Sequence, residues 1–109
     1  MDDTLKYANQ YLYSDIKPFE IVKTVSEKCV EIRAMNFYET EVSKIKRQAS
    51  FVSGGFVGHF DNSVQDWCIT SNPDANPFKI RLHADGWWYS GGCRFKLSDH
   101  PNRFYDFNF

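Results

Sequence analysis

The chain has 109 residues, of which 42% are apolar and 25% are charged. These shares are close to the averages of a soluble globular domain, so the composition excludes a disordered, collagenous or coiled-coil protein. The 13 basic and 14 acidic residues nearly cancel, which argues against a protein that is basic throughout, as strong nucleic-acid binders usually are. Aromatic residues are frequent, with ten Phe, six Tyr and three Trp. Because sheets favour aromatic side chains, the composition favours a β protein. The length is that of a single domain, residues 1–109.

The first third of the chain predicts a β-hairpin. Residues 7–13 are polar and aromatic, and they indicate a short helical turn that leads into a strand. The β-branched run 19–25 and the alternating run 29–35 then flank a short polar break, which is typical of a hairpin. In the second run, we expect Val30 and Ile32 to share the buried face.

The middle of the chain is less regular. Within residues 36–50, Tyr38, Val42 and Ile45 have the spacing of one helical face, and a charged mobile connection fits this segment equally well. The glycine-rich run 51–60 lacks the Gly-Lys-Ser/Thr ending of a phosphate-binding loop. We therefore expect this run to form a bulge or a sharp bend in a curved sheet.

The last third predicts a meander of short strands. Phe78, Ile80 and Leu82 alternate with polar side chains, as in a strand with one buried face. The predicted order is a strand at 65–70, a loop at 72–77, strands at 78–83, 87–89 and 93–97 with turns at 84–86 and 90–92, a loop at 98–102 and a terminal strand at 104–109. Six or seven short strands, with one or two helical turns at most, predict a mainly β fold, a small antiparallel barrel or roll of the size of an SH3 domain.

The candidate binding residues lie on this meander. Lys79, Arg81 and His83 share the polar face of one strand, and two further basic residues share that of another. Rings between them suit single-stranded nucleic acid, because bases stack on rings while phosphates meet Lys or Arg. An ordinary solvated face and a protein interface anchored by Trp, Tyr and Arg are the alternatives. The complete candidate set is Lys79, Arg81, His83, Trp87, Trp88, Tyr89, Arg94 and Lys96.

Catalytic and metal sites have less support in the sequence. Three cysteines without a CxxC pair indicate reduced thiols rather than a disulfide framework or a zinc site. An enzyme that uses His59, His83 or His100 as a base is a third functional alternative. We expect no catalytic residue, no metal and no cofactor. The acidic start of the chain and the short apolar runs predict neither a secretory signal nor a membrane span.

Several segments resemble a family of small uncharacterised proteins that phages and prophages carry. The likeness covers residues 10–109 and rests on the segments YLYSDIKPFEIVKTVSEKCVEIRAM, GGFVGHFDN, WCITSNP and IRLHADGWWYSGGCRFKLSDHPNRFYDFNF. Cys29 and Cys93 stand where the family pattern has polar residues, which argues against a shared catalytic thiol. His83 and Ala84 stand where basic residues are usual, which weakens the basic face.

The resemblance implies a phage accessory protein in the cytoplasm of the host cell. Small phage proteins without a catalytic motif commonly act by binding. We therefore expect a non-catalytic module that inhibits a host or defence protein by direct contact, as an anti-CRISPR inhibitor does, with binding of single-stranded DNA or RNA as the alternative.

Overall fold

The computed structural model describes residues 5–44 and 65–105. The predicted bend at 51–60, with His59, lies outside these described residues, as do Ile45 and the last four residues of the predicted terminal strand. In the described part of the predicted terminal strand, Phe104 forms a single β-bridge with Ile16 instead of a strand. No helix of the described residues is long and apolar enough to cross a membrane.

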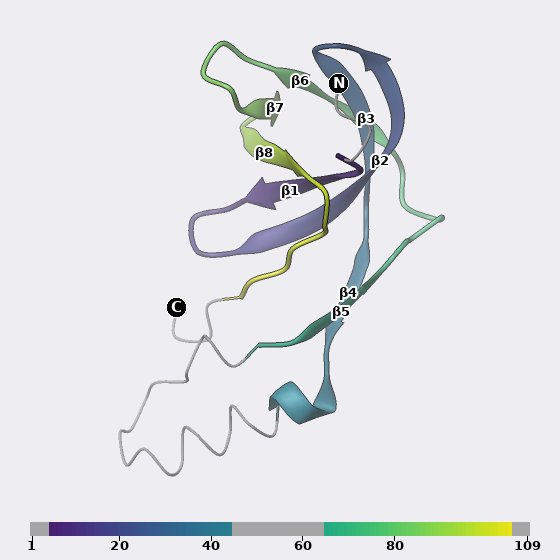
Figure 1. The fold of residues 1–109 in the computed structure, drawn as a ribbon, viewed down its shortest axis with the longest axis vertical. Coiled ribbons are helices and arrows are strands. Elements are labelled where there is room, and N and C mark those ends of the chain that lie inside the picture. Colours follow the sequence, from purple (N-terminus) through teal and green to yellow (C-terminus); the bar gives the residue numbers. More distant parts are fainter. Residues whose placement is uncertain (1–4, 45–64, 106–109) are drawn as a thin grey trace.

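Six antiparallel strands close into a barrel, which confirms the predicted mainly β fold (Figure 1). Around the barrel the order is β1-β2-β3-β6-β7-β8, and β8 pairs with β1 to complete the ring. Closure leaves no strand edge of the barrel open to pairing with another chain. The strands are β1 (Tyr7–Tyr11), β2 (Ile16–Ser26), β3 (Cys29–Ala34), β6 (Phe78–Leu82), β7 (Trp88–Ser90) and β8 (Cys93–Ser98).

The predicted hairpin is formed by β2 and β3, which meet at a two-residue turn. Two register shifts interrupt their pairing, at Val22 and at Val25. Such bulges bend a strand, and Figure 1 shows β2 curving around one side of the barrel. The bulges also leave Val22 and Val25 41% and 44% exposed, although both residues are apolar.

The segment 7–13 is a strand over β1, so the prediction of a helical turn there is wrong. Its polar side chains do not alternate with apolar ones, because Asn9 and Gln10 are buried together with Ala8. The Asn9 side chain donates to the His100 carbonyl (3.2 Å) and accepts from the Asn102 N–H (2.9 Å). The loop after β8 thus covers the outer side of β1 and supplies the partners that buried amides need.

A two-stranded ribbon, β4 (Asn36–Glu39) and β5 (Trp67–Thr70), extends away from the barrel (Figure 1). The strand predicted at 65–70 is confirmed, whereas Tyr38 lies in a strand and not on the predicted helical face. Residues 41–44 form a short helical segment, and the Thr40 hydroxyl accepts from the Ser43 N–H (3.2 Å) as a helix N-cap does.

The core fills the barrel with aromatic rings and branched side chains. The ring of Phe19 packs edge-on against Phe95 (5.3 Å between centroids) and against Phe78 (5.7 Å). This explains part of the aromatic excess, because large rings fill a small curved sheet with few residues. The buried cluster consists of Ala8, Val30, Ile32, Ile80, Trp88 and Phe95, as the alternation in the sequence predicted for Val30 and Ile32.

Candidate binding face on β6, β7 and β8

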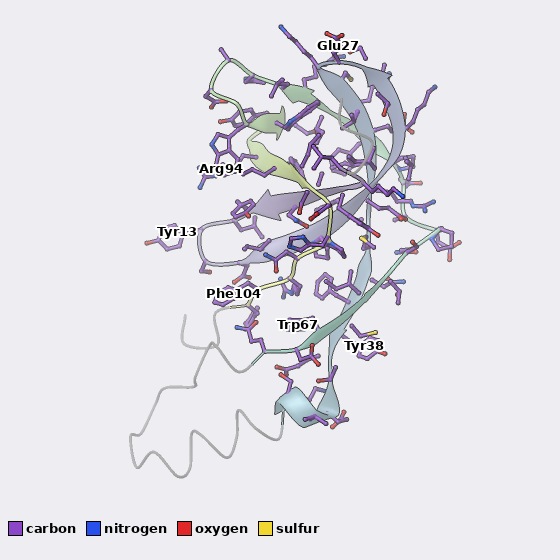
Figure 2. The ribbon with its side chains drawn as sticks, in the orientation of Figure 1. Tyr13, Glu27, Tyr38, Trp67, Arg94 and Phe104 are labelled. Atoms are coloured by element: carbon purple, nitrogen blue, oxygen red, sulfur yellow. The ribbon has the colours of Figure 1, made fainter. Side chains whose placement is uncertain are left out.

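The predicted meander brings most of the candidate residues onto one outer wall of the barrel. The register places Arg81 beside Tyr89, Tyr89 beside Arg94, and Arg94 beside Tyr11 of β1. A cation and a ring therefore alternate across four neighbouring strands. Neighbouring strands lie about 4.8 Å apart, so each cation is within reach of a ring on either side. Figure 2 shows Arg94 on the outer side of β8.

A second row lies about two residues further along the strands. The His83 N–H donates to the Trp87 carbonyl (2.9 Å), which continues the pairing beyond β6 and β7. The Trp87 ring lies under two cations, with Arg94 Cζ 4.5 Å and Lys96 Nζ 4.4 Å from its centroid. Tyr11 packs edge-on against Trp87 at 5.5 Å. We call this wall the basic–aromatic face; it consists of Tyr11, Lys79, Arg81, His83, Trp87, Tyr89, Arg94 and Lys96.

The turn before β7 holds Tyr89 in place. The Tyr89 hydroxyl donates to one oxygen of Asp85 (2.6 Å), and the Trp87 N–H donates to the other (2.9 Å). Because both bonds stabilise the carboxylate, the Tyr89 hydroxyl first and the Trp87 N–H second, they lower the pKa of Asp85 below its ordinary value. The same carboxylate raises the pKa of Tyr89. The Tyr89 ring lies 4.4 Å from the His83 ring between centroids.

Among the described residues, no ion pair neutralises the cations of this face. In the part of the chain that the structure describes, Lys79, Arg81, Arg94 and Lys96 form no salt bridge, and all four side chains are exposed. Two acidic residues lie at the face: Glu31 of β3 stands beside Lys79 in the register, and Asp85 accepts from the Tyr89 hydroxyl. Four cations against two carboxylates make the face locally positive on a chain whose formal net charge is −1.

The structure corrects one member of the candidate set. Trp88 is only 7% exposed and belongs to the core, opposite Leu82 and Phe95 in the register. The physical reason is the alternation of a strand, which sends Trp87 and Trp88 to opposite sides of the sheet. Trp87 is therefore the tryptophan of the basic–aromatic face.

Tyr11 and Ser90 were not among the candidate residues. Tyr11 joins the face only because β1 pairs with β8, a contact between residues 83 positions apart in the chain. Local alternation carries no signal for such a pairing. Ser90 ends β7, Gly91 begins the turn after it, and both border a hollow beside Arg81. A turn signal predicts where these residues lie in the chain but not what they face.

The rings of Phe37 and Trp67 lie in the ribbon and not on the basic–aromatic face. Trp67 packs edge-on against Phe37 (6.0 Å) in the ribbon. Arg103 lies over both rings, with its Cζ 4.3 Å from the Phe37 centroid and 5.1 Å from that of Trp67. Burial lowers the pKa of the Arg103 guanidinium. Arg103 also donates to the Ile16 carbonyl (3.3 Å), so this cluster fastens the ribbon to the chain beside the barrel.

In the described residues, His100 and the three thiols do not gather into one cluster. His100 contacts Asp99 (Nδ1 to Oδ1, 2.6 Å), and both side chains are exposed. Cys29 is buried, Cys68 is half-buried and Cys93 is exposed. Among residues 5–44 and 65–105, no three His, Cys, Asp or Glu side chains are grouped as metal ligands would be.

Comparisons with known proteins gave no match to a family model, to a curated protein or to a solved structure.

Proposed function

We propose that the protein is a non-catalytic module that binds single-stranded nucleic acid through the basic–aromatic face. The observation that carries this proposal is the row Arg81, Tyr89, Arg94 and Tyr11, in which cations and rings alternate across β6, β7, β8 and β1. Rings in such a row offer stacking surfaces to bases, and the cations between them meet the phosphates.

The charge of the face supports nucleic acid over protein as the partner. Protein interfaces have a centre that is depleted of charged residues, whereas nucleic-acid interfaces are polar and positively charged. Here exposed cations lie throughout the face, and two of the most exposed large apolar side chains lie away from it. These are Tyr38 on the ribbon (61% exposed) and Val42 in the helical segment (62%), whereas Tyr13 (95%) lies in the β1–β2 turn two residues after Tyr11 of the face. Figure 2 shows Tyr38 on the ribbon, far from Arg94.

The contacts within the face are weak enough for a strand to replace them. A cation over an exposed ring contributes about 0.5–1 kcal/mol. A base stacked on an aromatic side chain contributes about 1–3 kcal/mol, and the displaced cation gains a phosphate. Arg94 and Lys96 are therefore expected to leave the Trp87 ring and pair with the backbone when a base stacks there.

The resemblance to phage proteins makes an accessory role in a phage part of this proposal. Inhibition of a host or defence protein is the competing proposal, because Trp, Tyr and Arg also anchor protein interfaces. The two proposals make different predictions. Binding of a nucleic-acid strand requires the cations and rings of the face together, and it occurs without any host protein.

Fluorescence anisotropy with a labelled oligothymidine tests the proposal. The double variant Arg81→Ala with Arg94→Ala removes two cations from the row, so we expect its affinity to fall at least tenfold. Lys23→Ala is the matched control, because Lys23 is an exposed cation on β2, which lies opposite β7 in the ring of six strands. A duplex of the same length should bind more weakly, since its base faces are covered.

Equal affinity of the double variant and the Lys23 variant would contradict the proposal. The proposal would also be contradicted if the protein bound a purified host protein with an acidic surface through this face and did not bind the oligonucleotide.

A further inference from the structure

A hollow of about 420 Å³ opens at one side of the basic–aromatic face, where β6 lies beside the turn after β7. Its volume lies within the range of small-molecule sites, which is about 300–1,000 Å³. The hollow is therefore larger than the site of a single ion, and its volume suits a group the size of a nucleotide. The residues that line it are Lys79, Arg81, His83, Tyr89, Ser90 and Gly91.

The hollow collects more positive charge than one backbone phosphate requires. Lys79 and Arg81 bring two permanent charges, and the His83 imidazole and the Ser90 hydroxyl add further hydrogen-bonding groups. A phosphodiester has a single charge, whereas a phosphate monoester carries about −1.5 to −2 at pH 7 and offers three acceptor oxygens. Arg81 in particular can bind two of these oxygens at once.

Two acidic residues lie near the hollow, and neither forms a salt bridge with Lys79 or Arg81 among the described residues. Glu31 of β3 stands beside Lys79 in the register. Asp85 precedes Tyr89 in the turn, and its two oxygens already accept from the Tyr89 hydroxyl and the Trp87 N–H. The same bonds hold the Tyr89 ring at the wall of the hollow, with the His83 ring against it. The hollow thus has a fixed aromatic wall on one side and cations on the other.

We infer that this hollow is a seat for the terminal nucleotide of a strand, with its phosphate monoester held by Lys79 and Arg81. The inference rests on the proposed function, because the rest of the strand lies across Trp87 and Arg94. It adds that the protein distinguishes a phosphorylated strand end from a hydroxyl end.

Three labelled oligothymidines of equal length test this inference, one with a 5′-phosphate, one with a 3′-phosphate and one with hydroxyl groups at both ends. We expect one of the phosphorylated strands to bind about tenfold tighter than the hydroxyl strand, because the monoester gains charge-assisted hydrogen bonds. Equal affinity for all three strands would overturn the inference and leave the proposed function standing. Absence of binding by all three would overturn both.

Two variants separate the hollow from the rest of the face. Lys79→Ala removes a cation of the face and should weaken all three strands, but it should weaken the preferred phosphorylated strand about tenfold more than the hydroxyl strand and so abolish the preference. Lys96→Ala, which removes a cation beside Trp87, should weaken all three strands by the same factor and keep the preference. A preference that survives in Lys79→Ala would place the phosphate elsewhere.

A competition experiment identifies the source of the phosphate. Thymidine monophosphate should displace the phosphorylated oligonucleotide. Thymidine should not displace it, because the nucleoside has no phosphate for Lys79 and Arg81 to bind. A phosphoserine peptide that displaces the strand better than thymidine monophosphate would overturn the assignment to a nucleotide and favour a phosphorylated protein.

Discussion

Trp87 is the residue at which the cations and rings of the basic–aromatic face meet. Arg94 and Lys96 lie over its ring, and Tyr11 packs against it. It is half-buried, so its ring contributes to the surface without being part of the core. A ring in this position both orders the two cations and offers a stacking surface.

Trp87→Ala should therefore weaken oligothymidine binding by about 5-fold to 150-fold, which corresponds to the loss of one stacked base. Trp87→Phe keeps a ring and should retain most of the affinity. Thermal unfolding provides the control, because both variants must remain folded at the temperature of the titration. Unchanged affinity in the alanine variant would show that no base stacks on this ring.

Asp85 and Tyr89 give the face a pH dependence that can be measured directly. Tyr89→Phe removes the first hydrogen bond to the carboxylate, so the pKa of Asp85 should rise towards its ordinary value of 3.8. A carboxyl-carbon NMR titration measures this pKa. Since the folded state lowers the pKa of Asp85, its stabilising contribution is present above pH 3.8 and is lost as the pH falls through the lowered value.

The contribution of Tyr89 to stability depends on pH in the opposite direction. The carboxylate raises the pKa of Tyr89 above 10.0, so this contribution is present below pH 10.0 and is lost as the pH rises through the raised value. An Asp85 pKa that is the same with Tyr89 and with Phe at that position would contradict the role given to this bond.

At this scale the sequence predicted the face but not all of its members. Alternation alone placed Lys79, Arg81 and Arg94 on an outer face, because the strand period sends every second side chain to one side. It could not choose between the neighbours Trp87 and Trp88, since either parity fits a strand that begins with two tryptophans. Only the pairing of Trp88 with Leu82 and Phe95 decides which ring is buried.

The two turns of the meander hold the strands of the face in register. Gly86 and Gly91 have positive φ angles of 86° and 58° and are the described residues with this conformation. Other residues adopt such angles only at a cost, because Cβ comes too close to the carbonyl oxygen. Gly92 follows in the same turn and has no positive φ angle.

These three glycines allow a matched comparison of stability. A Cβ atom at any of them meets nothing within 4 Å, so substitution reports the backbone conformation alone. Gly86→Ala and Gly91→Ala should each lower the free energy of unfolding by about 1–2 kcal/mol. Gly92→Ala should leave it unchanged or raise it by up to about 1 kcal/mol. Urea denaturation measures all three, and an equal loss in each would contradict the assignment.

Elements with clear alternation were predicted well, and those defined by distant contacts were not. The β2–β3 hairpin and the β6–β7–β8 meander follow from alternating side chains and short turns between neighbouring strands. Residues 7–13 were predicted as a helical turn because the buried amide of Asn9 bonds to the loop at residues 100–102, a distant contact that the local pattern cannot show. In the part of the chain that the structure describes, β4 pairs with β5, across a gap of 27 residues between Glu39 and Trp67.

At the scale of the whole molecule, barrel closure completes the basic–aromatic face on a nearly neutral chain. The pairing of β1 with β8 brings Tyr11 to the row that contains Arg81, Tyr89 and Arg94. Composition predicted a β protein, and the count of charges argued against a strong nucleic-acid binder. A total charge averages over the surface, so it has no information about a single wall of a barrel.

The salt dependence of oligothymidine binding tests the central claim most directly. Four cations of the face are available to phosphates, so the logarithm of the association constant should fall against the logarithm of salt concentration with a slope of about −3. Removing Arg81 and Arg94 together should reduce the slope to about −1.4, and removing Lys23 should leave it unchanged. A slope near zero, or one that the loss of Arg81 and Arg94 does not change, would contradict binding of a strand by this face.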